Sequence, residues 1–388
     1  MKIEEIKLVN FRNYDREIIK PHKDINLFFG PNGSGKTNLL EAIHYCSLGK
    51  SHRVSNDQSV VRSGEEFALC SVSVRSRQVR REISVKLSPS EPNKKTINID
   101  HKKINRFSEL MGCLQCVIFS PEDLGLIKEG PSFRRRYLDM MISQVNKNYF
   151  IALQQYKVGM EQRNALLKSL RAKQSRNHAW LEDFENAIVG PAEIIITERK
   201  KIGEKLAVIA MDTYRHITGK DDEEFQLTYH STLSETENIV ASMKKQLEES
   251  REEDIRLGIT TIGPHRDDLT LMLNKRNMKI YASQGQIRTG ALSMKLSQMK
   301  ILNETSGEKP ILLLDAVMSE LDKTRRMRLL EEINDFQTFI TCTDESDLET
   351  KHDYRVYQVR SFENKGNIMQ KDAGKDFQQT IMLEPDFS

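Results

Sequence analysis

Apolar positions follow two different periods and divide the chain into strand-rich and helix-rich stretches. Residues 25–29 form a short apolar run that predicts a buried strand. Residues 37–48 then carry apolar side chains at helical spacing, and Gly49 is a suitable end for this helix. Residues 71–76 and 82–87 alternate apolar and polar side chains, which predicts two half-buried strands.

The middle of the chain has a helical pattern. Residues 133–170 place apolar side chains three and four positions apart, and the same spacing resumes over 192–217. Gly190-Pro191 predicts a break between these helices, which are too short for a long coiled-coil arm. Residues 222–256 are acidic and are expected at the surface.

Strand patterns return after residue 263. Apolar runs predict strands at 269–273, 279–282, 310–314 and 338–341, with helices between them. Strands that alternate with helices are typical of an α/β fold.

The composition excludes several classes of protein. No stretch reaches the ~18 apolar residues of a membrane helix, and the first residues lack the apolar region of a secretory signal, so we expect a cytoplasmic location. The length of 388 residues predicts two or three domains. Cys113 and Cys116 form a single C-x-x-C pair, and the five cysteines predict free thiols rather than a zinc site or disulfide framework.

A phosphate-binding loop follows the predicted strand at 25–29. Gly30 to Thr37 match G-x-x-x-x-G-K-[ST] at every position, and the backbone N–H groups of such a loop face phosphate at the start of a helix. Lys36 is expected to reach the β- and γ-phosphates of ATP, and the Thr37 hydroxyl to bind Mg²⁺. The alternative is a glycine-rich turn that binds nothing. The residues expected to bind the nucleotide here are Gly30, Pro31, Asn32, Gly33, Ser34, Gly35, Lys36, Thr37 and Asn38.

A second motif supplies an acidic partner for the loop. The apolar run Ile311 to Leu314 predicts a buried strand that ends at Asp315, at the sheet edge where α/β proteins bind ligands. Asp315 is therefore the expected second ligand of Mg²⁺, and a capping aspartate without a metal is the alternative. Because Lys36 and Asp315 must meet at one nucleotide, the nucleotide-binding domain is discontinuous and the helical region is an insertion in it.

The residues after Asp315 resemble those of the ABC-type ATPases. In that family the strand ends in Asp and Glu, and Ser-Ala-Leu-Asp follows two residues later; Ser319 to Asp322 align with this tetrapeptide without a gap. Ala316 then occupies the position of the catalytic acid that polarises the attacking water, which a methyl group cannot do. With Lys36 and Asp315 in place, we expect a chain that binds ATP and hydrolyses it poorly.

Residues 283–286 resemble the signature motif of the same family. The resemblance implies that the Ser283 hydroxyl and the Gly285 backbone, with Gln286 beside them, contact the γ-phosphate of a nucleotide held by another subunit. The alternative is a polar turn into a helix. Since the two half-sites belong to different faces of one head, the resemblance implies a head-to-tail homodimer that forms on ATP.

Nearly the whole chain is similar to the RecF family of ABC/SMC-like ATPases, which are bacterial recombination mediators. Members normally carry Asp-Asp where this chain has Asp315-Ala316. The resemblance implies an α/β ABC-type head made of residues 1–125 and 256–388, with an inserted, mainly helical domain at 126–255. The segments that carry it are LVNFRNY at 8–14, GKSHR at 49–53, FSPEDL at 119–124, RRRYLD at 134–139, QRNALL at 162–167, GPHRDD at 263–268 and FITCTD at 339–344.

The same resemblance implies a function. It points to an ATP-dependent clamp that binds double-stranded DNA at gaps or at single-strand/double-strand junctions, and that works with RecR and RecO. Such a clamp supports recombinational repair, replication restart and the SOS response. By family the chain is a DNA-dependent ATPase, whose hydrolysis Ala316 is expected to impair.

Several residues keep two interpretations. Gln115 is either the loop glutamine that binds Mg²⁺ in this class or a polar residue at a strand end. Arg12 and Arg53 either reach the nucleotide or are surface arginines. His265 and Arg266 either contact phosphate or an interface, or stabilise the turn after Pro264.

Positive charge gathers between Cys70 and Arg106. The whole chain has a net charge of only +3, but ten basic residues accompany three acidic ones in this stretch, which gives a local net charge of +7. We expect contact with the DNA backbone here, because no sequence-reading helix is recognisable. A solvated face is the alternative. The residues expected to contact DNA are Arg75, Arg77, Arg80, Arg81, Lys94 and Lys95.

Two other functions share the nucleotide motifs. A transporter-type ATPase needs a membrane-coupling partner, which the RecF-like opening and the helical insertion do not favour. An ATP-gated structural dimer without DNA agrees with the nearly neutral net charge.

Overall fold

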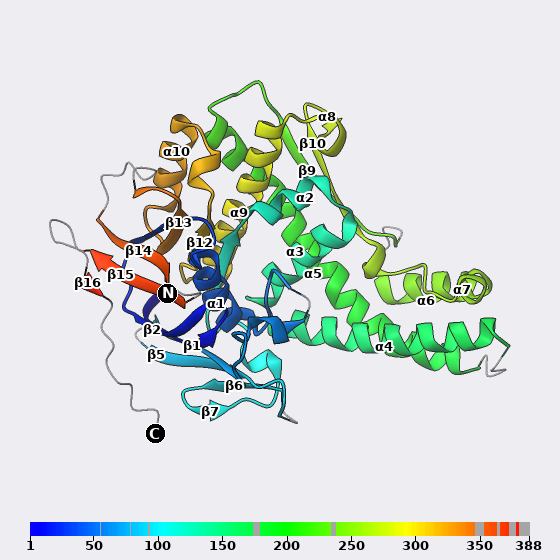
Figure 1. The fold of residues 1–388 in the computed structure, drawn as a ribbon. Helices are drawn as coiled ribbons and strands as arrows, with labels where there is room; N and C mark the ends of the chain where they lie inside the picture. Colours follow the sequence, from blue (N-terminus) through cyan, green and yellow to red (C-terminus); the bar gives the residue numbers. More distant parts are fainter. Residues whose placement is uncertain are drawn as a thin grey trace. The chain divides into compact units, whose positions relative to one another are not determined.

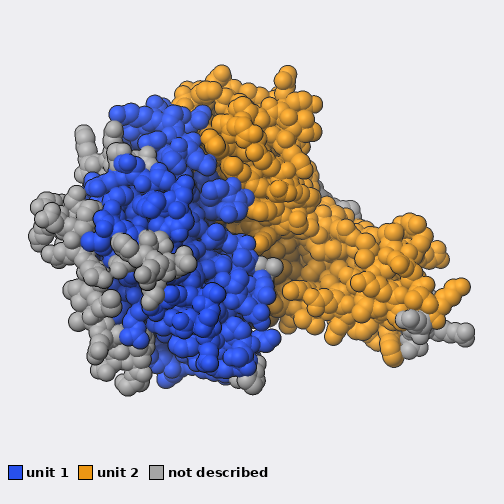
Figure 2. All heavy atoms as spheres, in the orientation of Figure 1, with its two compact units in different colours: residues 1–123, 298–388 blue, residues 124–297 orange. Residues whose placement is uncertain are grey.

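The structure, a computed structural model, divides into two compact units (Figures 1 and 2). Unit 1 comprises residues 1–123 and 298–388, and unit 2 comprises residues 124–297. Residues 256–297, which the sequence analysis joined to the head, therefore lie in unit 2. The residues that the structure describes are 1–54, 56–77, 79–91, 94–173, 179–233, 238–345, 353–362, 365–371 and 378–379.

A mixed sheet forms the core of unit 1. The strands from β14 to β8 are parallel, so their carboxyl ends meet at one edge of the sheet. β3, β8, β12 and β13 are short apolar runs that are buried almost throughout, as in parallel sheets that are covered on both faces. Among the described residues the strand order is β7 (Lys102–Lys103), β6 (Lys95–Ile99), β5 (Val79–Leu87), β4 (Ala68–Ser76), β1 (Lys2–Phe11), β2 (Tyr14–Ile19), β15 (Lys365–Lys371), β14 (Tyr354–Phe362), β3 (Ile25–Phe29), β13 (Thr338–Cys342), β12 (Ile311–Asp315) and β8 (Cys116–Phe119), and β16 (Gln378–Gln379) pairs with β15.

The helices of unit 1 include the one that follows the phosphate-binding loop. This helix, α1, spans Lys36–Leu48 and ends at Gly49 in the left-handed conformation, which confirms the predicted helix and its end. α10 (Lys323–Ile333) follows β12, and the last part of α9 (Gln284–Ser306) also belongs to this unit. Short 3₁₀ turns are η1 (Asp57–Val60), η2 (Phe107–Glu109), η3 (Pro121–Leu124) and η5 (Met318–Glu320).

Unit 2 is mainly helical. Its two longest helices, α4 and α5, lie side by side (Figure 1), and leucines of both helices (Leu166, Leu167, Leu170 and Leu181) form a buried cluster. A small antiparallel sheet has the order β11 (Arg276–Asn277), β10 (Asp268–Leu273), β9 (Phe225–His230). The remaining elements are α2 (Gly125–Lys128), α3 (Pro131–Ser143), α4 (Lys147–Arg171), α5 (Ala179–Thr218), α6 (Ile239–Glu249), α7 (Arg251–Leu257), η4 (Pro264–Arg266), α8 (Met278–Tyr281) and the first part of α9.

A buried ion-pair network fastens three helices of unit 2. The Arg163 guanidinium on α4 donates to Glu185 on α5 at 2.9 Å and to Asp254 on α7 at 2.7 Å. The Arg163 and Asp254 side chains are completely buried. The expectation that 222–256 is a surface segment is therefore wrong for Asp254, and also for the buried Phe225 of β9.

Two predicted elements are wrong. Residues 279–282 fall largely within the short helix α8 rather than a strand, because the Asn277 side chain accepts the Lys279 N–H and starts a helical turn. Pro191 lies inside α5, which continues through the expected break. A proline in a helix removes one hydrogen bond, but the buried Ile188, Ala192 and Ile195 on both sides of it hold the helix in place.

The other predicted strands and the cysteines agree with the structure. Strands occupy 268–273, 311–315 and 338–342, and the two alternating runs are the paired strands β4 and β5. All five cysteines are buried thiols, and none of them forms a disulfide, as predicted. Within the described part of the chain, no helix combines the length and the apolar character needed to cross a membrane.

Candidate nucleotide-binding site

The phosphate-binding loop joins β3 to α1 and depends on glycine at two close contacts. A Cβ at Gly30 would lie 2.2 Å from the Val359 carbonyl oxygen, and one at Gly35 would lie 2.4 Å from the Asn13 amide nitrogen. Gly35 also has a φ of 111°, which disfavours residues with a side chain. The loop can therefore take this path only with glycine at both positions.

The polar groups of the loop suit a phosphate. The Lys36 ammonium donates to the carbonyl oxygens of Gly30 and Pro31 at 2.7 and 2.9 Å, and burial lowers the pKa of Lys36. Ser34 Oγ is buried and has no hydrogen-bond partner among the described residues. The first turn of α1 has no acidic residue to oppose an anion. A cation, an unused hydroxyl and a helix start thus converge on one loop, as anion binding requires.

Asp315 lies next to this loop, as the sequence predicts. The Thr37 hydroxyl donates to Asp315 Oδ1 at 2.9 Å, although the two residues are far apart in the chain. Thr341 on the neighbouring strand β13 donates to the same oxygen at 2.6 Å. The carboxylate and the two hydroxyls form an oxygen cluster that fits Mg²⁺, for which Thr37 and Asp315 are the candidate ligands. Thr341 belongs to no recognisable nucleotide-binding motif, and its role depends on the register of β12 and β13.

Ala316 stands directly after Asp315 in an unusual conformation. Its φ is 55°, in the left-handed region, and its N–H donates to the Thr341 hydroxyl at 2.9 Å. Asp and Asn tolerate this region better than Ala does. The backbone is thus shaped for a polar side chain, whereas the methyl group of Ala316 can neither accept nor donate a proton.

Gln115 does not fit the metal-binding role. It precedes β8, and the parallel register pairs Cys116 with Ile311, at the end of β12 opposite to Asp315. Its side chain is buried and accepts a hydrogen bond from Ser306 at 3.0 Å. At about 3.3 Å per residue along four residues, Gln115 is more than 10 Å from the Asp315 edge of the sheet. It is a polar residue at a strand end, the alternative that the sequence left open.

Residues from the first strands brace the loop. The Asn13 amide donates to the Ser34 carbonyl at 2.9 Å and accepts from Asn38 at 2.8 Å. The Tyr14 hydroxyl donates to the Gly35 carbonyl at 3.0 Å. The Asn38 side chain therefore helps to hold the loop in place. Apart from their place in the RecF-like opening, Asn13 and Tyr14 carry no pattern that predicts this role.

Arg12 and Arg53 both bind a buried carboxylate on α1. Arg12 makes two hydrogen bonds to Glu41, at 2.7 and 2.9 Å, and Arg53 Nη1 lies 3.5 Å from the same carboxylate. Burial opposes ionisation of Glu41, but the hydrogen bonds from Arg12 and Ser51 outweigh it and lower the pKa of Glu41. The two arginines therefore lie beside α1 in unit 1 and share the single carboxylate of Glu41, so neither is an unpaired surface arginine.

The signature residues begin α9 in unit 2. The Ser283 hydroxyl accepts the Gln286 N–H at 3.3 Å, and the Gln286 side chain accepts the Ser283 N–H at 2.9 Å, which forms a reciprocal cap. Because Ser283 Oγ acts as an acceptor here, its own proton remains available to donate. Ser283 is exposed, whereas the Gln286 amide also donates to Glu223 at 3.3 Å and serves the fold.

His265 and Arg266 stabilise a turn in unit 2. His265 Nδ1 lies 2.7 Å from the Tyr156 hydroxyl and Nε2 lies 3.0 Å from the Thr260 carbonyl oxygen, to which Arg266 also donates. Burial lowers the pKa of His265, which favours the neutral ring. Of the two interpretations, the geometry supports the turn.

The predicted DNA-binding residues differ in how strongly they are paired. Arg75 and Arg80 both pair with Glu4, at 2.5 and 3.4 Å, and Arg77 pairs with Glu308 at 3.3 Å. Arg81 is exposed and contacts the Cys113 sulfur, and Lys94 is exposed. Lys95 does not fit a DNA surface, because its ammonium binds Asp57 and the Gly49 carbonyl and lies over the Tyr45 ring.

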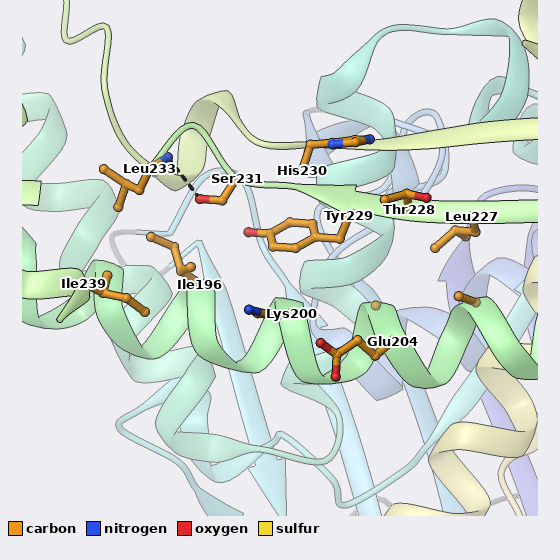
Figure 3. Close-up of a pocket in the computed structure, with 12 residues that line it drawn as sticks. Ile196, Lys200, Glu204, Leu227, Thr228, Tyr229, His230, Ser231, Leu233 and Ile239 are labelled. Carbon is orange, nitrogen blue, oxygen red and sulfur yellow. Dashed lines mark hydrogen bonds between the residues drawn. The ribbon is translucent and has the colours of Figure 1, made fainter. Parts of the chain in front are cut away.

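Unit 2 also has a groove between α5 and β9, drawn in Figure 3, with a volume of about 450 Å³. Lys200 and Glu204 line it from α5, and Tyr229 lines it from β9. Gly203 allows this close approach, since a Cβ there would lie 3.0 Å from the Tyr229 Cβ. None of the residues predicted to bind nucleotide, metal or DNA lines the groove.

Comparisons with known proteins agree on one family. Residues 2–367 match the family model described as RecF/RecN/SMC N terminal domain. The chain is 41% identical over 349 residues to the DNA replication and repair protein RecF of Clostridium perfringens, covering 90% of this chain and 94% of that protein. It is also similar to two solved structures, described as the recombination mediator protein RecF-ATP and RecF-ATPrS in the RecFOR pathway. Both are 35% identical, with TM-scores of 0.87 and 0.85; they cover 95% and 94% of this chain, and the match covers 97% of each.

Proposed function

The chain belongs to the RecF family, and we propose that it is an ATP-binding clamp of recombinational DNA repair whose hydrolysis step is disabled at Ala316. The observation that carries this proposal is the Asp315 carboxylate, held by Thr37 and Thr341 beside the loop, with the methyl group of Ala316 directly after it. The binding half of the site is intact, and the residue that should polarise water is missing.

Binding of ATP uses groups that already converge on the loop. The N–H groups at the start of α1 face the phosphates, and Lys36 exchanges its carbonyl partners for phosphate oxygens. Thr37 and Asp315 would hold Mg²⁺, which would neutralise part of the phosphate charge. Asn13 and Tyr14 keep the loop open by holding the Ser34 and Gly35 carbonyl oxygens.

Hydrolysis needs a base or a strong acceptor to orient the attacking water, and position 316 is where the family carries a carboxylate. Loss of such a group typically costs 10²–10⁴-fold in rate. Bound ATP therefore persists, and the clamp stays closed for longer than in a relative that carries an acid there.

Closure joins two copies of the chain. Ser283 of one copy donates its hydroxyl proton to the γ-phosphate held by the loop of the other, so that ATP links the two in a head-to-tail dimer. The exposed Ser283 and its free proton support this role.

The closed dimer binds double-stranded DNA through its backbone, at gaps or strand junctions, and acts with RecR and RecO. The similar solved structures are described as members of the RecFOR pathway, which supports these partners. Arg81 and Lys94 are the best candidates for phosphate contacts, since Lys95 is engaged within the fold.

An ATP-gated dimer without DNA binding is the second candidate. Ion pairs among the predicted DNA-binding residues favour it. Glu4 and Glu308 neutralise much of the positive charge there, because they pair with Arg75, Arg77 and Arg80. A gel-shift assay with ATP distinguishes the two functions. The clamp predicts binding that falls steeply with salt and is indifferent to sequence, whereas the structural dimer predicts no shift.

A single-turnover ATP cleavage assay tests the disabled step. Ala316→Asp should raise the cleavage rate of bound ATP by about 100-fold or more over the natural chain. Ala316→Asn is the matched control, since Asn suits the left-handed backbone but lacks a carboxylate, and it should leave cleavage slow. Equal rates for the natural chain and Ala316→Asp would refute the proposal, provided that both bind ATP equally well.

A further inference from the structure

Two large apolar side chains stand out on the surface beside the signature. Ile280 and Tyr281 of α8 are 70% and 65% exposed, more than any other large apolar side chain of the described residues. They are adjacent in the chain and precede Ser283 by three and two residues, respectively. Exposed apolar groups that lie together mark interaction sites, and tyrosine is enriched among the residues that carry binding energy.

Buried contacts hold these two side chains in their outward position. Met278 of the same short helix is buried, and its Cε lies 3.0 Å from the place of a Cβ at Gly290 on α9. Asn277 caps the start of α8, and the Ala282 N–H donates to the Met278 carbonyl at its end. The backbone that carries Ile280 and Tyr281 is therefore held in place before any partner binds, which reduces the entropy lost on binding.

The surroundings of the pair indicate what it binds. Every charged residue between Leu269 and Asn303 is basic, and Lys275, Arg276 and Lys279 are exposed beside the pair. A hollow of about 360 Å³ next to Tyr281 is lined by Arg276, Met278 and Gln286 among others. One acidic side chain, Glu224, is exposed next to Asn274, and the Glu223 carboxylate is already bound by Lys220, Tyr214 and Gln286. The three basic side chains outnumber the exposed acidic one, so this surface suits a partner surface that carries negative charge.

A second copy of the chain with bound ATP offers such a surface. The polyphosphate of ATP is strongly negative, and the Asp315 carboxylate at the end of β12 lies beside the phosphate-binding loop in unit 1. Resting on the proposed function, in which Ser283 reaches the nucleotide of another copy, we propose that Ile280 and Tyr281 are the apolar anchor of that contact. The basic rim steers the approach, and the anchor supplies contact area that the small Ser283 and Gly285 cannot.

Removal of the anchor tests this proposal. In the full chain, the Ile280→Ser/Tyr281→Ser variant should weaken ATP-dependent dimerisation at least tenfold in sedimentation velocity. Binding of a fluorescent ATP analogue by the monomer should be unchanged, because the phosphate-binding loop lies in the other unit. Tyr281→Phe, which keeps the ring, should dimerise like the natural chain.

The control variant is Ile151→Ser/Val158→Ser, which removes two other exposed apolar side chains, 41% and 53% exposed, from α4 in the same unit. It should leave dimerisation unchanged, and the thermal midpoints of both variants should match that of the natural chain. If the anchor variant dimerises normally while Ser283→Arg does not, the anchor is refuted and the proposed function stands. If ATP fails to dimerise the natural chain, or Ser283→Arg dimerises normally, the proposed dimer itself is wrong. An anchor variant that loses DNA binding but not dimerisation would assign this surface to DNA instead.

Discussion

The nucleotide loop of unit 1 and the signature of unit 2 are built in opposite ways. Around the loop, Asp315 accepts hydrogen bonds from the hydroxyls of Thr37 and Thr341. Asn13 and Tyr14 donate hydrogen bonds to backbone carbonyl oxygens of the loop. The signature has one reciprocal cap, and its Ser283 faces solvent beside two exposed apolar side chains. Under the proposed function, unit 1 binds the nucleotide by itself, and a second copy of the chain covers the signature.

The largest expected effect is a loss of stability in unit 2 when the buried ion-pair network is broken. Arg163→Met leaves Asp254 buried without its cation, and it should lower the free energy of unfolding by about 3–5 kcal/mol. Chemical denaturation measures this loss. Lys157→Met, which removes the exposed partner of Glu161 from the same helix, should change stability little. Equal stability of both variants would mean that the buried network does not fasten the helices.

The stability of unit 1 should depend on pH through Glu17, a buried carboxyl group on β2. Burial raises the pKa of Glu17 to about 8 from its usual 4.5, so the folded state retains a proton that the unfolded chain loses. Stability should therefore fall as the pH rises from about 5 to 8, by an amount of the order of 4 kcal/mol, and stay lower above that range. Denaturant midpoints across this range measure it. Glu17→Gln should flatten the slope, and an unchanged slope in this variant would contradict the assignment.

Nucleotide affinity should respond to unit 1 alone. Lys36→Ala should weaken ATP binding by the monomer about 100-fold, roughly 2.7 kcal/mol, because it removes the cation that faces the phosphates. Ser283→Arg should leave the same affinity unchanged in a fluorescent-analogue titration. A comparable loss in both variants would show that the two half-sites are not independent in the monomer.

The smallest expected effect concerns the backbone at position 316. Ala316→Asn should raise the free energy of unfolding by roughly 0.5–1 kcal/mol, because Asn suits the positive φ better than Ala. Ala316→Val should lower it, since a β-branched side chain is strained there. Thermal midpoints of the three proteins should follow the order Asn, Ala, Val, and any other order would argue against strain at this residue.

What the sequence could predict depends on how local the determinants are. The loop from Gly30 to Thr37 is recognisable because strand, turn and helix follow one another in the chain. Asp315 is recognisable because it ends an apolar strand. Gln115 is misassigned, because only the register of β8 against β12 reveals that it lies at the wrong end of the sheet. Lys95 is misassigned for a related reason, since its partner Asp57 is distant in sequence.

The fold shows the same limit. Residues 279–282 have strand-like composition, but a single side-chain cap at Asn277 turns them into a helix. Pro191 predicts a break that buried neighbours on both sides override. At Pro191 a local preference of about 3 kcal/mol loses to packing that only the folded chain supplies, whereas at 279–282 a side-chain cap two residues upstream outweighs the strand-like composition.

The most direct test of the two-copy site mixes two defective chains. Lys36→Ala lacks a working loop and Ser283→Arg lacks a working signature, so neither should dimerise with ATP on its own. In a mixed dimer, the loop of the second chain meets the signature of the first, and one complete site forms. Light scattering at micromolar protein should therefore show an ATP-dependent dimer only in the mixture. A mixture that remains monomeric under conditions where the natural chain dimerises, or Ser283→Arg alone forming the dimer, would contradict a site shared between two copies.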